Sequence, residues 1–285
     1  MEELKYYDMK QIYLLIIFLL LTCIQVFAEK TLVILHTNDT HSQLEPYTEE
    51  DRRNAGQAGI VRREALYRTI RAEEPNVLVF DIGDFVQGTP YFNFFKGDAE
   101  VGLMNYLKID ALTLGNHEFD NGIDFLVRML KKATFPIVST NYDLSATRLK
   151  RLVKPWIIIK KDGMRIGIVS ANINPVGLIT PKNYEGMVWL DPIKTAEKRA
   201  AWLKEKKKCD IVICLSHLGY KYQDNTPDDL KLAAGSKNID VILGGHTHTF
   251  MKEPAIVNNL DGKPVIINQV GKGGILVGKL KLSVE

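Results

Sequence analysis

Short apolar runs followed by polar clusters recur along the chain. Five segments each contain a run rich in valine, isoleucine and leucine followed by aspartate, asparagine, glycine or histidine. They occupy residues 31–41, 76–84, 109–120, 209–217 and 238–248. The runs are apolar at nearly every position, which is typical of strands covered on both faces, as in α/β proteins. We therefore expect five buried strands, each with its polar cluster at the carboxyl end.

Amphipathic helices are predicted between these strands. Apolar residues recur at the spacing of one helix face within 123–130 and 193–203. Residues 57–73 form a third such segment, with apolar positions among arginines and glutamates at Val61, Ala65, Leu66 and Ile70. The alternation of strand and helix predicts βαβ units with parallel strands.

A second sheet is predicted from the remaining β-rich segments. Residues 153–171 contain two apolar runs joined at Asp162-Gly163, a dipeptide typical of a hairpin turn. Residues 264–284 add two strands around a glycine-rich turn. The expected fold is an α/β layered β-sandwich flanked by helices, with mixed sheets and βαβ units. We expect residues 29–285 to form one domain, since no linker or internal repeat interrupts them.

Composition narrows the class of protein. Hydrophobic residues make up 46% and charged residues 25% of the 285 residues, as in an ordinary globular protein. The formal charge is only +3, and no basic patch with interleaved aromatic residues is present in the sequence. A nucleic-acid polymer is therefore not expected as a partner.

The first residues predict export. An apolar run at 12–21 follows Lys10, and Val26 and Ala28 occupy the positions that a signal peptidase reads, which predicts a signal peptide at 1–28. The run is shorter than the ~20 residues of a membrane span. We therefore expect no transmembrane span in the mature chain and a periplasmic or extracellular location.

Three alternatives remain at this end of the chain. Met9 is a more conventional start for a signal peptide than Met1, so residues 1–8 could precede the true start. The sequence LLTC could make Cys23 the lipidated residue of a lipoprotein, although threonine is unusual before such a cysteine. An uncleaved anchor is the third alternative.

Two cysteines remain after the predicted cleavage. Cys209 and Cys214 lie five positions apart in one predicted strand, so their side chains should point to opposite faces and be unable to pair. We expect no intrachain disulfide.

Side chains with metal-binding chemistry gather at the five strand ends. They are Asp39, His41, Asp84, Asn116, His117, Asp120, His217, His246 and His248. Ligands of open α/β sheets bind beyond the carboxyl ends of the strands, so these side chains could converge. Carboxylates, imidazoles and an amide suit Zn²⁺, Mn²⁺ or Fe, and the lack of cysteine argues against a closed structural zinc site. Of the six histidines, only His36 lies outside the clusters.

Each cluster alone has an ordinary alternative. Asp39 and His41 could belong to an ordinary turn or helix cap, and Asp84 and Asp120 could cap the elements that follow them. Asn116 could occupy a left-handed turn, and His217 could be a histidine at a strand end without further role. His246 and His248 are harder to explain in this way, because alternate residues of an extended segment place two imidazoles on the same side. All five alternatives would have to hold together for the site to be absent.

Five sequence blocks resemble one known group of enzymes. In order, they are ILHTNDTHS, FDIGDFVQGTP, LGNHEFDNG, SHLGY and GGHTH. They resemble the calcineurin-like metallophosphoesterase superfamily and, more narrowly, its secreted 5′-nucleotidase / 2′,3′-cyclic phosphodiesterase / UDP-sugar hydrolase family. Residues 180–196 are also similar to that family's connecting segment, so the resemblance covers 31–285. It implies the metallophosphoesterase fold.

The resemblance implies two divalent metal ions, Zn, Mn or Fe. The first would be held by Asp39, His41 and His248, and the second by Asn116, His217 and His246, with Asp84 bridging both. Members of the secreted family often carry Gln or Asn in place of His248, so this chain departs from them there.

The resemblance also implies a catalytic pair. Asp120 would orient the imidazole of His117, which would stabilise the phosphoryl transition state or protonate the leaving oxygen. We expect Glu118 to be structural, Asn38 to support a ligand by hydrogen bonding, and His36 to be a strand residue.

The predicted function is that of an exported two-metal hydrolase of phosphomonoesters, with 5′-nucleotides as the expected substrate. A cyclic-nucleotide or other phosphodiesterase is one alternative, and a non-catalytic metal-binding subunit of a split enzyme is another. Family members with nucleotide specificity carry a C-terminal substrate-binding domain, which would begin about where GKLKLSVE ends the chain. We expect that domain to be absent here, or to be carried by a separate polypeptide, and the sequence predicts no substrate-binding residues.

Overall fold

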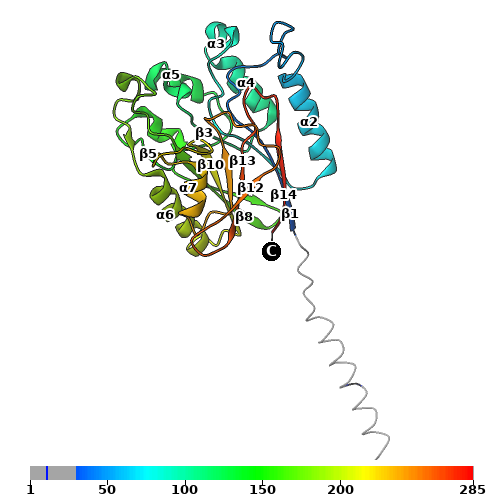
Figure 1. Cartoon of the computed structure of the whole chain (residues 1–285), viewed down its shortest axis with the longest axis vertical. Helices are drawn as coiled ribbons and strands as arrows, with labels where there is room; N and C mark the ends of the chain where they lie inside the picture. The colour runs from blue at the N-terminus through cyan, green and yellow to red at the C-terminus, as the bar shows by residue number, and fades with distance from the viewer. Residues whose placement is uncertain (1–10, 12–29, 285) are drawn as a thin grey trace, which may run out of the picture. The chain divides into compact units, whose positions relative to one another are not determined.

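Two six-stranded sheets lie face to face in the computed structural model, which describes residue 11 and residues 30–284 (Figure 1). The first sheet has the strand order β14 (Gly278–Val284), β1 (Lys30–Thr37), β2 (Val77–Asp81), β3 (Ala111–Thr113), β4 (Ile137–Val138) and β6 (Val153–Lys154). Strands β1, β2, β3, β4 and β6 run parallel, as the predicted βαβ units require.

The second sheet is mixed. Its order is β12 (Ala255–Asn258), β13 (Pro264–Asn268), β11 (Val241–Gly244), β10 (Ile211–His217), β8 (Met164–Asn172) and β7 (Ile157–Lys161). The four inner strands are parallel and the two edge strands antiparallel. The predicted hairpin is β7–β8, and its turn residues Asp162 and Gly163 both have positive φ. A small sheet pairs β5 (Tyr142–Asp143) with β9 (Val188–Trp189).

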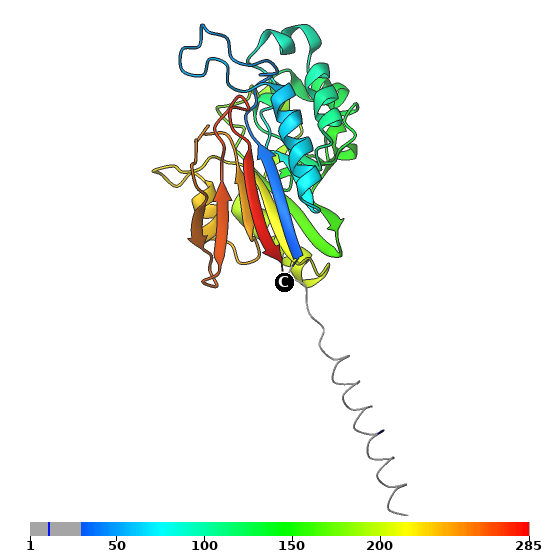
Figure 2. The ribbon, with the colours of Figure 1, turned by 90° about the vertical axis from the view of Figure 1, so that its right-hand side faces the viewer.

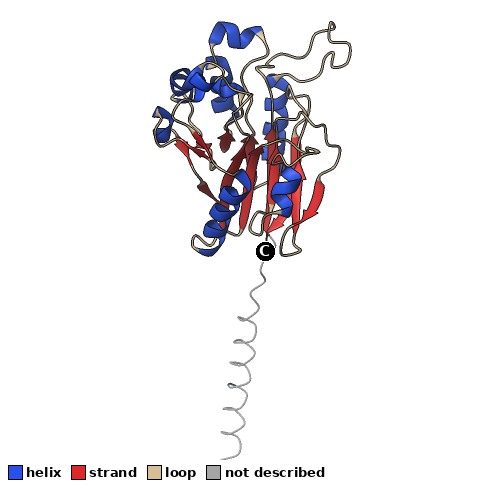
Figure 3. Ribbon diagram, turned by 60° about the vertical axis from the view of Figure 1, so that its left-hand side comes forward, coloured by secondary structure: helices blue, strands red, loops and turns tan. Residues whose placement is uncertain are grey.

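Helices cover the outer face of each sheet, with the strands between them (Figure 3). On the first sheet they are α2 (Ile60–Glu73), α3 (Pro90–Phe95), α4 (Asp98–Leu107) and α5 (Gly122–Leu130); on the second they are α6 (Pro192–Glu205) and α7 (Asp229–Ala234). Short 3₁₀ turns are η1 (His117–Phe119), η2 (Arg148–Arg151) and η3 (Pro181–Tyr184). One apolar core lies between the sheets and one under each helical layer, which confirms the predicted sandwich.

Three details differ from the sequence expectations. The last two strands do not share a sheet: β13 joins the second, whereas β14 lies beside β1 in the first (Figure 2). Helix α2 buries Ile70 as expected, but it also buries Tyr67 and leaves Val61 77% exposed and Leu66 42% exposed. Cys209 precedes β10, so it shares the helix-covered core with Cys214 rather than facing away from it; both are free within the described residues.

The N-terminal expectations fall largely outside the described residues, since 1–10 and 12–29 contain the predicted cleavage site and Cys23. Among the residues that the structure describes, no helix has the length and apolar character needed to cross a bilayer.

Candidate metal centre

The five polar clusters meet where the carboxyl ends of the two sheets face each other. Strands β1, β2 and β3 of the first sheet lead to three clusters, and β10 and β11 of the second lead to two. The ends are close: Asp39 Oδ1 lies 3.4 Å from His248 Nε2, and Asp84 Oδ2 lies 3.1 Å from His217 Nε2. Donors far apart in sequence therefore share one small volume.

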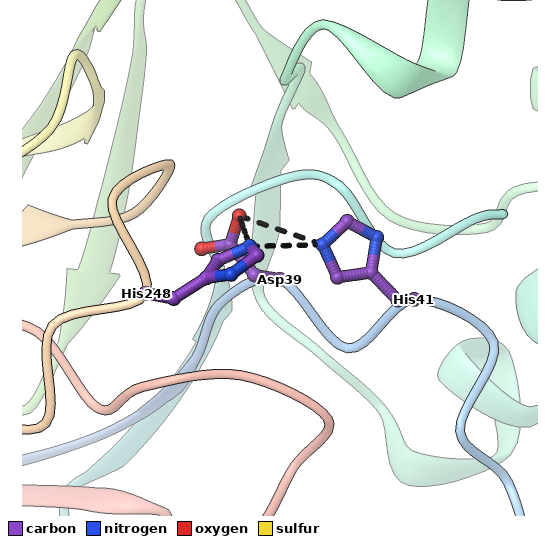
Figure 4. A group of neighbouring side chains, drawn as sticks. All are labelled: Asp39, His41 and His248. Carbon is purple, nitrogen blue, oxygen red and sulfur yellow. Dashed lines mark hydrogen bonds and ion pairs between the residues drawn. The ribbon is translucent and has the colours of Figure 1, made fainter. Parts of the chain in front are cut away.

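One group of donors consists of Asp39, His41 and His248, and we call it the outer cluster. Their ligand atoms all lie within 4.8 Å of one another. Figure 4 shows the two imidazoles turned toward the Asp39 carboxylate, with 3.1 Å between the two Nε2 atoms. Three nitrogen and oxygen donors gathered this closely are what a cation site requires.

A second group consists of Asp84, His217 and His246, and we call it the inner cluster. Its ligand atoms also lie within 4.8 Å of one another. Asp84 is 2% exposed and His217 is fully buried. His217 Nε2 is also 3.9 Å from Asp39 Oδ1, so the two clusters adjoin. Two candidate metal sites side by side fit a dinuclear centre.

The hydrogen bonding of His217 tests whether a cation fits between these groups. Its Nδ1 lies 2.6 Å from the carbonyl oxygen of Ile82, which can only accept, so Nδ1 carries the proton. In the neutral ring, Nε2 then presents a lone pair to the Asp84 carboxylate. Two acceptors at such a distance repel each other unless a proton or a metal ion lies between them.

Unpaired acceptors support the same conclusion. Asp39 Oδ1, Asn116 Oδ1 and His217 Nε2 are buried and have no hydrogen-bond partner. Buried acceptors without partners are uncommon, and each needs an explanation. An added Cβ at Gly115 would lie 2.2 Å from Asp84 Oδ1, and the backbone N–H of His117 donates to the same oxygen over 2.8 Å, so the backbone on both sides of Asn116 lies beside the inner cluster. All three atoms are of the kinds that bind divalent metals, and the donor set fits two such ions.

The electrostatics favour positive charge at the inner cluster. Burial alone would lower the pKa of His217, but the Asp84 and Asp39 carboxylates outweigh it and raise the pKa to about 10. Burial, followed by the charge of His217, lowers the pKa of His246 to about 4. Burial would raise the pKa of Asp84, but His217 and the neighbouring histidines hold it well below its usual range. The cluster thus stabilises one cation without a metal, and neutral imidazole remains available as a ligand.

The outer cluster is reinforced by Asn38. Its Nδ2 donates to Asp39 Oδ2 over 2.7 Å and to the carbonyl of Gly271 over 2.6 Å, while its Oδ1 accepts from the backbone of Val270. Asn38 therefore fixes one carboxylate oxygen of Asp39 and leaves the other free, as expected for a residue that supports a ligand.

The inner cluster is reinforced by Glu118. This side chain is 1% exposed and accepts hydrogen bonds from the backbone N–H groups of Asp84, Phe85 and Gly115. It therefore pins the loops after β2 and β3 to each other, which agrees with the structural role expected from the sequence.

The backbone is left-handed at several donors. Asp39, His41, Asp84, His246 and His248 all have φ between 47° and 74°. Such values are uncommon outside glycine and cost conformational energy that the surrounding structure must offset. Strained backbone gathered at one place is a property of binding and catalytic sites.

The sequence-predicted pair His117 and Asp120 lies beside these clusters. His117 Nδ1 is 2.7 Å from Asp120 Oδ2, and the His117 ring centroid is 5.3 Å from that of His41. The hydrogen bond to Asp120 outweighs partial burial and raises the pKa of His117 to about 9. The His117 side chain is 40% exposed, so a protonated imidazole faces the open side of the centre.

One contact was not anticipated from the sequence. Asn183 of η3 donates its Nδ2 to the carbonyl of Asp120 over 2.6 Å. No local pattern around residue 183 indicates this contact, because its partner lies 63 positions away. His36, by contrast, is the buried strand residue expected: it contacts Asn268 over 2.9 Å, and burial lowers its pKa to about 4.

The chain is similar to known phosphoesterases in sequence. Residues 32–250 match the family described as calcineurin-like phosphoesterase. The 5′-nucleotidase of Homo sapiens is 33% identical over 275 residues, which cover 89% of this chain and 46% of that protein. The snake venom 5′-nucleotidase of Crotalus adamanteus is 33% identical over 88% of this chain and 45% of its own length. The chain thus spans less than half the length of these relatives.

Solved structures agree with the sequence comparison. The 5′-nucleotidase precursor from Thermus thermophilus superposes with a TM-score of 0.81 and 35% identity, over 90% of this chain and 52% of that one. The NAD nucleotidase of Haemophilus influenzae gives a TM-score of 0.78 and 29% identity, over 89% and 47%. With the family match and the two adjacent donor clusters, these likenesses show that the chain belongs to the calcineurin-like phosphoesterase family of metal-dependent phosphoester hydrolases.

Proposed function

We propose that this chain is an exported two-metal phosphomonoesterase that acts on 5′-nucleotides. The observation that carries the proposal is the juxtaposition of two adjoining donor clusters with the hydrogen-bonded His117–Asp120 pair beside them. The named relatives, most of which are 5′-nucleotidases, support the nucleotide as substrate. Similarity to a snake venom protein supports export.

The donors would divide as the resemblance implies. Asp39, His41 and His248 would hold one ion, and Asn116, His217 and His246 the other, with Asp84 between them. Their oxygen and nitrogen chemistry suits Zn²⁺, Mn²⁺ or Fe. Bound as a pair, such ions polarise phosphate oxygens and generate a nucleophile from water near neutral pH.

The chain's own side chains would supply the remaining chemistry. Protonated His117 carries a positive charge where a phosphoryl group would develop negative charge, and its proton can pass to the leaving oxygen. Asp120 holds the other ring nitrogen, so the imidazole cannot rotate away. The Asn183 amide donates a hydrogen bond to the Asp120 carbonyl oxygen and so holds the backbone of Asp120 in place. Metal storage alone would need none of these three, which argues against a non-catalytic subunit.

A phosphodiesterase activity is the second candidate. It is favoured by 30% identity, over 89% of this chain, to the trifunctional nucleotide phosphoesterase YfkN of Bacillus subtilis. That match covers 18% of the relative. The two candidates differ in whether the phosphate that reaches the centre carries one ester group or two.

An ester-hydrolysis assay that measures both the alcohol or chromophore released and the inorganic phosphate formed separates these candidates, because hydrolysis of a diester leaves a phosphomonoester and releases no inorganic phosphate. The chain is loaded with Mn²⁺ or Zn²⁺ and offered nucleoside 5′-monophosphates, 2′,3′-cyclic nucleotides and a matched pair of chromogenic mono- and diesters. We expect faster turnover of the monoesters. Preference for the diesters would reverse the assignment, and no turnover of any ester by the fully metallated chain would refute the proposal. The expected separate polypeptide with a substrate-binding domain stays a prediction, and adding such a protein to the assay tests it.

A further inference from the structure

A cleft rich in positive charge lies at the far end of α5. It has a volume of about 550 Å³ and is bounded by the end of α5 and the residues around η2. Lys131, Arg148, Lys150 and Arg151 line it, and no acidic residue does. Val127 and Leu152 supply apolar contact. The volume is within the range of small-ligand sites.

The positive charges in this cleft are poorly compensated. Arg148 pairs with Asp124 over 2.7 Å, but both side chains are mostly exposed, at 65% and 77%, so the pair is weak. Lys131, Lys150 and Arg151 make no ion pair with any described residue. Like charges held around a concave surface reinforce one another's field and attract anions.

The cleft is separate from the metal centre. Helix α5 begins at Gly122, just after Asp120, and ends at Leu130. Its nine residues span about 13 Å, and Lys131 lies beyond its last turn. None of the residues lining the cleft belongs to either donor cluster or to the His117–Asp120 pair. Occupation of the cleft would not block the metal centre.

We propose that this cleft is a second binding site for a small phosphate-bearing anion. Two guanidinium groups can each donate a pair of hydrogen bonds to phosphate oxygens, and two lysines add charge without directional demands. Inorganic phosphate, pyrophosphate and the phosphates of a nucleotide share this chemistry. The proposal stands whether or not the metal centre hydrolyses nucleotides, because it depends on a different set of residues.

The test compares two variants that each remove two positive charges. Lys131→Ala with Arg151→Ala alters the cleft, whereas Lys206→Ala with Lys208→Ala removes the same charge from exposed positions after α6. Calorimetric titration of the metallated protein with pyrophosphate should show one site more in the wild type than in the cleft variant, or a Kd at least about tenfold weaker there. The control variant should bind as the wild type does, and basal hydrolysis should be unchanged in both.

Parallel titrations identify the source of the phosphate. Inorganic phosphate and a non-hydrolysable methylene analogue of a nucleoside diphosphate are titrated beside pyrophosphate. Tighter binding of the analogue would assign the site to nucleotides, and equal binding would assign it to phosphate groups alone; either result supports the proposal.

Two results would overturn it. Equal weakening in both variants would mean that only net charge matters. A fall of kcat/KM in the cleft variant, with the number of pyrophosphate sites unchanged, would mean that the cations steer substrate to the metal centre and bind nothing themselves. If the metal centre itself binds no phosphate, the wild type should still show one site and the cleft variant none, so failure of the proposed function is distinguishable.

Discussion

The two donor clusters differ in how firmly they are held. In the inner cluster, Asp84 and His217 are buried, and His217 is fixed by a 2.6 Å hydrogen bond to a strand-end carbonyl. In the outer cluster, the side chains of His41 and His248 are 19% and 35% exposed. The distance from His41 Nδ1 to the nearest carbonyl, that of Val86, is 3.4 Å.

This difference predicts unequal metal sites. Ligands that are buried and hydrogen-bonded keep their orientation without the metal, so binding costs little further ordering. In the outer cluster Asp39 is buried and held by Asn38, but the two partly exposed imidazoles must be ordered by the ion itself. We therefore expect the inner ion to be retained and the outer ion to exchange more readily.

The largest effect is expected when the residue between the clusters is removed. Asp84→Ala should cause the loss of both ions and lower the rate of phosphate release by more than about 10²-fold. Loss of a residue that only hydrogen-bonds a metal ligand would lower the rate less. Elemental analysis and the phosphate assay measure both effects. Asp143→Ala, which removes an exposed carboxylate elsewhere, is the matched control. Two retained ions with normal turnover would show that Asp84 is no ligand.

A second substitution separates metal binding from chemistry. His117→Ala should reduce kcat by about 10² to 10⁴-fold while both ions remain bound, because the imidazole contributes a proton and a charge but no ligand atom. Metal content is measured on the same sample as kcat. An unchanged rate would remove His117 from the mechanism.

The third prediction concerns pH. The pKa of His117 is raised from 6.5 to about 9, so its proton is present below that value and lost as pH rises through it. Activity that needs the proton should decline on the alkaline side, and bound cations would move this limb lower. Asp120→Asn removes the largest cause of the shift, so the limb should move further toward neutral pH. Rate profiles of both proteins test this, and coincident profiles would contradict it.

The smallest effect is expected at His248. His248→Gln keeps a neutral side chain with an atom that can bind a cation, so we expect only a roughly tenfold loss of affinity for the outer ion. Dialysis followed by elemental analysis should leave close to one ion per chain, compared with two in the wild type. Loss of both ions together would mean that the clusters do not differ as proposed.

Local patterns predicted most of the site because its residues follow strands. Asp39, Asp84, Asn116 and His217 each stand at the end of an apolar run, and such runs are visible in the sequence. The contact of Asn183 with Asp120 could not be found in this way, since it joins a turn to a loop through one amide.

The remaining differences between the predicted and the observed fold depend on contacts between residues far apart in the sequence. Strand β14 lies beside β1 and not beside β13 because of pairing between distant parts of the chain. The local hydrophobic pattern carries no information about that pairing. In α2, the inward face includes the buried Arg63. Arg63 is only 7% exposed and its Nε is buried, so a pattern that counts only apolar residues misplaces this face.

Ions bound where the ends of the two sheets meet should also stabilise the fold. His41 and His248 are 207 positions apart and follow strands of different sheets. An ion bound by both would therefore cross-link two loops that most of the domain's sequence separates. A cross-link that closes so long a loop restricts the unfolded chain strongly. Cys209 and Cys214 form no bridge. Bound cations would therefore act as removable cross-links, and chelation should make the sandwich more susceptible to proteases as well as abolish hydrolysis.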